Sequence, residues 1–157
     1  MFYASTIVLS FILITHFMGR LLHKKANFSK NYSWLLAIFF VVIGSILLST
    51  WNGGVTGNLI QHSMGGGVAT ALGYFYIKKQ LRLSFRWQIE LTIMLGMVSL
   101  LGNINEMLEF AADVAGYGPF SFDRFDTWRD IVANTTGAII CFLVVKTYRR
   151  FFTNNRV

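Results

Sequence analysis

Apolar residues in this chain form long runs that are separated by short polar connections. We identify five runs, at residues 2–18, 34–50, 57–77, 87–104 and 131–148, of which the third is the most polar. Each run is close to the ~20 residues with which a helix crosses the hydrocarbon core of a bilayer. Backbone amides find no water partners in lipid, so we predict that each run forms a helix.

The composition agrees with a membrane protein rather than with a soluble domain. Of the 157 residues, 54% are hydrophobic and only 13% are charged, whereas soluble domains carry about 25% charged residues. We therefore predict an all-α, polytopic bundle of about five transmembrane helices, with residues 1–157 as a single transmembrane domain. The first run has no basic residues before it and no clear cleavage site after it, so we expect it to be retained rather than removed as a signal peptide.

Basic residues are concentrated in three clusters that hold 12 of the 14 lysines and arginines. The clusters follow the first, third and fifth runs, so five spans place all three on one side of the membrane. The positive-inside rule makes this side cytoplasmic, with the N-terminus outside and the C-terminus inside. We interpret the net charge of +7 as this orientation signal, with contacts to anionic lipid headgroups at the cytoplasmic face and none to nucleic acid. The clusters are Arg20, Lys24, Lys25 and Lys30; Lys78, Lys79, Arg82 and Arg86; and Lys146, Arg149, Arg150 and Arg156.

Acidic residues gather on the opposite, outer side. Six of the seven lie within 25 consecutive positions, from the end of the fourth run to the start of the fifth. On helices, the first three and the last three each follow an i, i+3, i+7 spacing, and residues so spaced share one face. Ionisable residues below the headgroups are costly and usually face a bundle interior or a wet cavity. The six residues are Glu106, Glu109, Asp113, Asp123, Asp126 and Asp130.

Polar residues of the third run are expected at a similar depth. Asn58 and His62 are one helical turn apart near its outer end, and Asn134 extends the stripe of the fifth run. Small residues recur every four positions in both runs, which lets helix backbones approach closely in lipid, and we expect the glycines at 65–67 to serve this packing. Polar side chains from three helices therefore converge on one outward-facing pocket. The small residues are Gly65, Ala69 and Gly73, and Ala133, Gly137 and Cys141.

Three interpretations of this pocket are open. Carboxylates with an amide suit a hard divalent cation such as Mg²⁺, Mn²⁺ or Ca²⁺, and His62 could join for a softer metal. Alternatively, the carboxylates perform acid–base or proton-relay chemistry. In the third interpretation the acids are structural: Asp123 or Asp126 caps the last helix, and Arg124 and Arg129 pair with their neighbours.

The first two interpretations assign specific roles to these side chains. Arginine is suited to a phosphate or a carboxylate, so the arginines join the binding group. We predict catalytic roles for His62, Glu106 and Asp130, substrate binding by Asn58, Arg124, Arg129 and Asn134, and metal ligation by Glu106, Glu109, Asp126 and Asp130.

The same residues carry a resemblance to a known family. The stretch 124–138, with Asp126, Asp130, Asn134 and Gly137, resembles the last motif of the VanZ-like membrane proteins, and Asn58-x-x-x-His62 is similar to their Asp-x-x-x-His element. Glu106 and Glu109 fit the same pattern. This chain departs from the pattern in having asparagine at 58 and three residues, rather than two, between Asp126 and Asp130. The resemblance covers about residues 55–140 and implies a small protein of the bacterial cytoplasmic (inner) membrane, with a site at these polar residues.

Together, these observations lead us to expect a protein that binds or processes a lipid-linked or cell-envelope molecule at the outer face, with help from a cation. The competing interpretation is a non-enzymatic envelope protein or a small transporter, whose acids bind ions, relay protons or stabilise the outer rim. A remoter possibility is a lipid kinase resembling the small membrane diacylglycerol kinases. The outer placement of the acids, away from cytoplasmic ATP, argues against a kinase.

Overall fold

The computed structural model describes residues 3–22, 32–117 and 125–154, and all regular secondary structure within them is helical. The predicted all-α class is therefore confirmed for this part of the chain. Asp123 and Arg124, the latter a predicted substrate-binding residue, lie outside the described residues. The helices are α1 (Tyr3–Leu22), α2 (Tyr32–Asn52), α3 (Gly54–Ile60), the π-helix η2 (Gln61–Val68), α4 (Ala69–Gln80), α5 (Trp87–Val114) and α6 (Asp126–Asn154).

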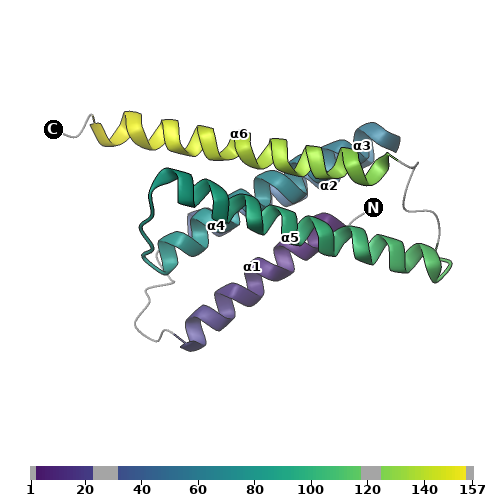
Figure 1. The fold of residues 1–157 in the computed structure, drawn as a ribbon, viewed down its shortest axis with the longest axis horizontal. Helices are drawn as coiled ribbons and strands as arrows, with labels where there is room; N and C mark the ends of the chain where they lie inside the picture. Colours follow the sequence, from purple (N-terminus) through teal and green to yellow (C-terminus); the bar gives the residue numbers. More distant parts are fainter. Residues whose placement is uncertain (1–2, 23–31, 118–124, 155–157) are drawn as a thin grey trace.

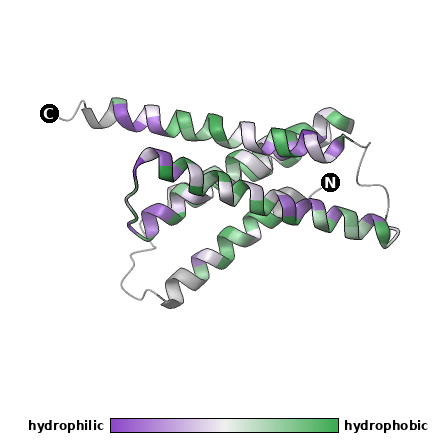
Figure 2. Cartoon of the chain, viewed as in Figure 1, coloured by the Kyte–Doolittle hydropathy of each residue, from purple (hydrophilic) through white to green (hydrophobic). Residues whose placement is uncertain are grey.

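Among the described residues, three helices are long and apolar enough to cross a membrane. They are the stretches Ser33–Asn52, Trp87–Val114 and Asp126–Phe151, which include the second, fourth and fifth predicted spans. In α1 the apolar stretch Ile7–Phe17 is shorter. Figure 2 shows the hydrophobic middle of α6 and the more hydrophilic residues toward its two ends. Both α5 and α6 reach beyond the predicted spans, because helical structure continues through the acidic residues at 106–113 and 126–130.

The third predicted span forms one continuous helix, residues 54–80, built from α3, η2 and α4, which we call the central helix. It is the most enclosed part of the fold, since α1, α2, α5 and α6 all pack against it. Its buried side chains include Tyr74, Phe75 and Tyr76, and the Tyr76 hydroxyl forms a hydrogen bond with His16 Nδ1 of α1. Enclosure explains the polarity of this span, because neighbouring helices surround its polar groups.

A tight turn reverses the chain between α2 and the central helix. Gly53 and Gly54 adopt positive φ angles of 62° and 48°, which glycine accepts without the steric cost paid by other residues. The turn places α3 and the first residue of η2 against the end of α2, where the Ser49 hydroxyl donates a hydrogen bond of 2.9 Å to Gln61 Oε1. The turn therefore fixes the depth at which Asn58 and His62 enter the bundle.

The helices alternate in direction, so that each end of the bundle has its own charge. At the left of Figure 1 lie the end of α4, the start of α5 and the end of α6, and at the right lie the end of α5 and the start of α6. The first group, with the connection between α4 and α5, carries the described basic residues of the second and third clusters, and we call it the basic end. The second group, with the start of the central helix, carries the described acidic residues except Glu90, and we call it the acidic end.

The basic end is held by one buried carboxylate. Glu90 of α5 is 1% exposed and pairs with Lys78 of α4 and with Lys146 of α6. Arg149 lies over the rings of Trp34 and Phe75, at 5.8 and 5.2 Å from their centroids. These contacts tie α2, the central helix, α5 and α6 together at this end.

Candidate functional site

A π-helix positions the histidine of the site. Residues Gln61–Val68 form two wide turns in the middle of the central helix, and His62 is the second residue of this segment. Three consecutive glycines, at 65–67, make a regular α-helix less favourable here, and π-helical turns are frequent at functional sites. The wider turn places His62 among buried residues that face α5 and α6.

Glycines bring the central helix and α6 into direct backbone contact. A Cβ atom on Gly66 would collide with the Asn134 side chain, and one on Gly137 would collide with the backbone carbonyl of Ser63. Side chains would push the two helices apart at both positions. The predicted packing role of the small residues is thus confirmed for these glycines, and it is what brings His62 within reach of α6.

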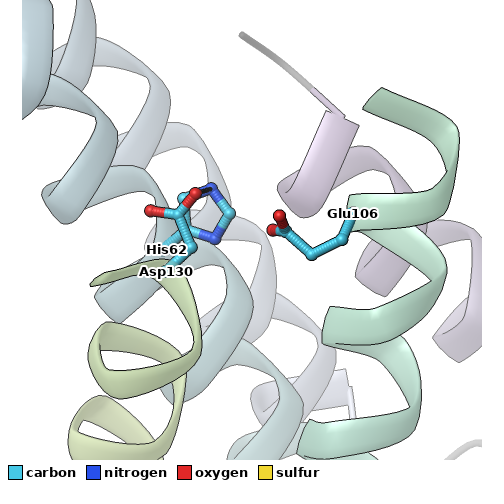
Figure 3. A group of neighbouring side chains, drawn as sticks. All are labelled: His62, Glu106 and Asp130. Carbon is cyan, nitrogen blue, oxygen red and sulfur yellow. Dashed lines mark ion pairs between the residues drawn. The ribbon is translucent and has the colours of Figure 1, made fainter. Parts of the chain in front are cut away.

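His62, Glu106 and Asp130 form the centre of the site. They come from η2, α5 and α6, and Figure 3 shows the Glu106 carboxylate directed from α5 toward the other two. His62 Nε2 lies 3.3 Å from Asp130 Oδ2. One possible ligand atom from each of the three residues lies within 4.8 Å of the others. His62 and Asp130 are each 1% exposed, so this is an internal cluster rather than a group of surface acids.

Two asparagines hold this cluster from either side. Asn58 Nδ2 donates to Asp130 Oδ1 at 2.9 Å and approaches Asp126 Oδ1 at 3.4 Å. On the other side, Asn134 Nδ2 lies 3.4 Å from His62 Nδ1. Both were predicted to bind substrate. Because their amides are buried and contact the cluster itself, the geometry gives them a positioning role toward Asp130 and His62.

The other two predicted metal ligands, Glu109 and Asp126, lie next to the cluster. Each interacts with a residue outside it. Glu109 Oε1 accepts a hydrogen bond of 2.8 Å from Asn105 Nδ2. Asp126 Oδ1 lies 3.4 Å from Arg129 Nη2. Of the predicted metal ligands, the structure therefore brings Glu106 and Asp130 together with His62, and places Glu109 and Asp126 in the surrounding layer.

Two carboxylate oxygens of the cluster make no hydrogen bond among the described residues, although His62 Nε2 lies 3.3 Å from one of them. They are Glu106 Oε1 and Asp130 Oδ2, and both are buried. A buried polar atom without a partner costs free energy, and more so if it carries charge. The two oxygens face the imidazole of His62 from different helices. Their position therefore calls for a cation or a proton that satisfies both.

Asn105 belongs to this site, and sequence reasoning missed it. It is 1% exposed and bonds to Glu109 one turn later. The spacing of residues in the sequence could have identified it, because Asn105 continues the stripe of buried α5 residues formed by Met94, Val98 and Leu101. A polar residue on the face that packs against the bundle core marks the point where the core becomes polar.

Comparisons with protein-family models, with curated proteins and with solved structures found no match for this chain. The resemblance to the VanZ-like proteins therefore stays a prediction. The side chains of the site form a cluster of one imidazole and two carboxylates at the junction of three helices.

Proposed function

We propose that this chain is an integral membrane protein that holds a divalent cation near the outer face and uses it to bind or process a lipid-linked or cell-envelope molecule. One observation carries the proposal. His62, Glu106 and Asp130 meet inside the bundle with ligand atoms within 4.8 Å of one another, and two of the carboxylate oxygens are buried without making a hydrogen bond among the described residues. A cation at this point would satisfy both oxygens.

The membrane part of the proposal is supported by the exterior of the bundle. Three helices have the length and hydropathy of membrane spans, and large apolar side chains such as Phe40, Leu47 and Leu143 are exposed on α2 and α6. Soluble monomers rarely expose large contiguous apolar patches. In our proposal α1 and the central helix also cross the membrane. The basic end then faces the cytoplasm, and the acidic end faces outward, as in a bacterial inner-membrane protein.

The ligand set favours particular cations. Calcium and magnesium prefer all-oxygen sites, whereas an imidazole with two carboxylates suits Mn²⁺, Zn²⁺ or Fe²⁺. Of the cations predicted from sequence, Mn²⁺ fits best. Ligand bonds of about 2 Å around one ion require the three groups to move slightly closer together. Three protein ligands leave open positions, which is typical of catalytic rather than structural metal sites.

Asn134 could adapt His62 to a metal. A histidine that binds a cation through Nε2 carries its proton on Nδ1 and usually donates it to a neighbouring acceptor. Asn134 Oδ1 is buried without a partner among the described residues, while its Nδ2 is the atom near His62 Nδ1. Rotating this amide by half a turn exchanges the two atoms, so the oxygen would accept the Nδ1 proton. Asn134 is then a positioning residue for the ligand.

The competing proposal is that the cluster only fixes the packing of three helices. Its specific support is Asn58, whose amide contacts both Asp126 and Asp130, and the Arg129–Asp126 pair. Buried polar networks can specify a unique arrangement of helices. Under this proposal the acids share protons, and no cation binds.

Metal binding to the purified full-length protein separates the two proposals. We expect about one equivalent of Mn²⁺ or Zn²⁺ by elemental analysis after dialysis, and a higher melting temperature on adding the metal. Glu106→Gln and Asp130→Asn should lose this metal. Glu109→Gln, the matched control on α5, should keep it, because Glu109 lies outside the cluster. A wild-type protein that neither retains nor is stabilised by Mn²⁺, Zn²⁺, Mg²⁺ or Ca²⁺ would overturn the cation proposal and favour the packing role.

A further inference from the structure

A groove lies on the outside of the molecule between the central helix and α6. Its volume is about 590 Å³, within the range of roughly 300–1,000 Å³ that is usual for ligand pockets. The walls are almost entirely apolar and include Leu59 and Ile60 on one side and Trp128 and Val132 on the other. The same two helices contribute residues to the groove and to the polar cluster, but they do so with different faces.

The groove is long enough for the part of an acyl chain nearest the headgroup. Its lining residues run from Phe125, just before α6, to Thr136 on α6, and from 56 to 63 on the central helix. At 1.5 Å per residue the wall from Arg129 to Thr136 is about 10 Å long, which is about two-thirds of the ~15 Å half-thickness of a hydrocarbon core. The outer part of an acyl chain therefore fits the groove in both length and polarity.

Of the described residues that line the groove, one is charged, and it is a cation. Arg129 lines the groove beside Trp128, one turn from the start of α6. The N-terminus of a helix favours negative charge, and a guanidinium with five N–H donors can bind a carboxylate and a phosphate at once. Arg129 is about two-thirds buried and contacts Asp126. The mouth of the groove is thus complementary to an anionic headgroup.

Arg129 also links the groove to the polar cluster. Its partner Asp126 contacts Asn58, and Asn58 donates to Asp130. A phosphate at Arg129 would therefore be connected to Asp130, a proposed cation ligand, through Asp126 and Asn58. This arrangement would hold the headgroup next to the cation site while the acyl chain stays in an apolar environment.

We propose that this groove holds an acyl chain of an anionic phospholipid from the outer leaflet, with the phosphate at Arg129. The proposal rests on the membrane location proposed above and deepens that function by naming a phospholipid as the class of molecule that reaches the cation site. The groove itself needs no metal. Lipid binding and cation binding can therefore fail independently.

Photo-crosslinking in a bilayer tests the groove. The full-length protein is reconstituted in phosphatidylcholine vesicles that contain a trace of phosphatidic acid with a diazirine in one acyl chain, and the labelled peptides are mapped by mass spectrometry. We expect labels concentrated at 56–63 and 125–136, displaced by unlabelled phosphatidic acid and not by inorganic phosphate. The same pattern in the presence of a metal chelator would separate the groove from the cation. Labels spread evenly over the exposed faces of α2, α5 and α6 would overturn the proposal.

Three variants make the test specific. Thr136→Trp fills the groove and should remove most of the label from 56–63. Ile140→Trp, the matched control one turn along α6 and outside the groove, should leave the label unchanged. Arg129→Gln should reduce labelling by the phosphatidic acid probe several-fold and labelling by a phosphatidylcholine probe much less. Equal labelling of wild type and Thr136→Trp would contradict the acyl-chain site, and equal loss of both probes in Arg129→Gln would contradict the headgroup assignment.

Discussion

The two ends of the bundle contain buried ionisable clusters built on the same three helices but balanced in opposite ways. At the basic end, Glu90 is neutralised by Lys78 and Lys146. At the acidic end, Glu106 and Asp130 face His62, a residue that carries charge only when protonated. Buried charges are tolerated when they are paired. The basic end is therefore complete by itself, whereas the acidic end requires a proton or a cation.

The two clusters are also related by position. On each helix their members are 16 residues apart, at 62 and 78, at 90 and 106, and at 130 and 146. For α5 and α6 this separation corresponds to about 24 Å along the helix, slightly less than the ~30 Å of a hydrocarbon core. Each cluster would thus lie just inside one boundary of the membrane. The two clusters would lie at similar distances from their membrane boundaries but differ in charge balance. We therefore interpret the neutralised cluster at the basic end as structural and the cluster at the acidic end as functional.

The largest effect should come from removing the shared carboxylate at the basic end. Glu90→Ala leaves two lysines facing each other near the ends of α4 and α6, and breaking a buried ion pair costs about 3–5 kcal/mol. We expect a clear loss of thermal stability in detergent, with or without divalent metal. If the variant melts like the wild type, the basic end is not the structural cluster that the comparison requires.

The corresponding change at the acidic end should behave differently. Asp130→Asn replaces a buried carboxylate oxygen that makes no hydrogen bond among the described residues, so in chelator the variant should be as stable as the wild type or more stable. With metal at 100 times its dissociation constant, the wild type alone should gain about 2.7 kcal/mol. Melting curves with and without Mn²⁺ measure both effects. Strong destabilisation in chelator would mean that the acidic end is also structural.

A smaller effect is expected from crowding the contact between η2 and α6. A methyl group on Gly66 would collide with Asn134, and overpacking typically costs about 1–3 kcal/mol. Gly66→Ala should lower both the melting temperature and the metal affinity, because Asn134 contacts His62. Gly96→Ala is the matched control, since a Cβ at Gly96 meets nothing within 4 Å. Equal effects of the two changes would show that the close approach is unimportant.

The smallest effect on stability should follow from loss of the Arg129–Asp126 pair. Its nitrogen and oxygen are 3.4 Å apart, and the Arg129 side chain is 32% exposed, so the pair contributes at most about 1 kcal/mol. Arg129→Gln should melt within a few degrees of the wild type while losing its preference for phosphatidic acid. A large drop in stability would make Arg129 part of the helix packing instead of the groove.

The sequence predicted the helices and the convergence of three of them, because long apolar runs and stripes of acids are local patterns. It did not predict which acids meet His62. Glu106 and Glu109 share one face of α5, so spacing alone cannot tell that Glu106 reaches the cluster while Glu109 bonds to Asn105. Helix crossing decides this, and it depends on glycine contacts between η2 and α6. The pairing of Glu90 with lysines from two other helices is non-local for the same reason.

The π-helix has a consequence for the length of the central helix. Relative to a regular α-helix, a π-turn accommodates one inserted residue, and one residue corresponds to about 100° of rotation around an α-helix. Deleting a single glycine from 65–67 would allow this segment to become α-helical. Asn58 and His62 would then turn away from α6, while α4 kept its contacts. A change of one residue in the length of η2 would thus rotate α3 relative to α4, and this rotation sets which way the site faces.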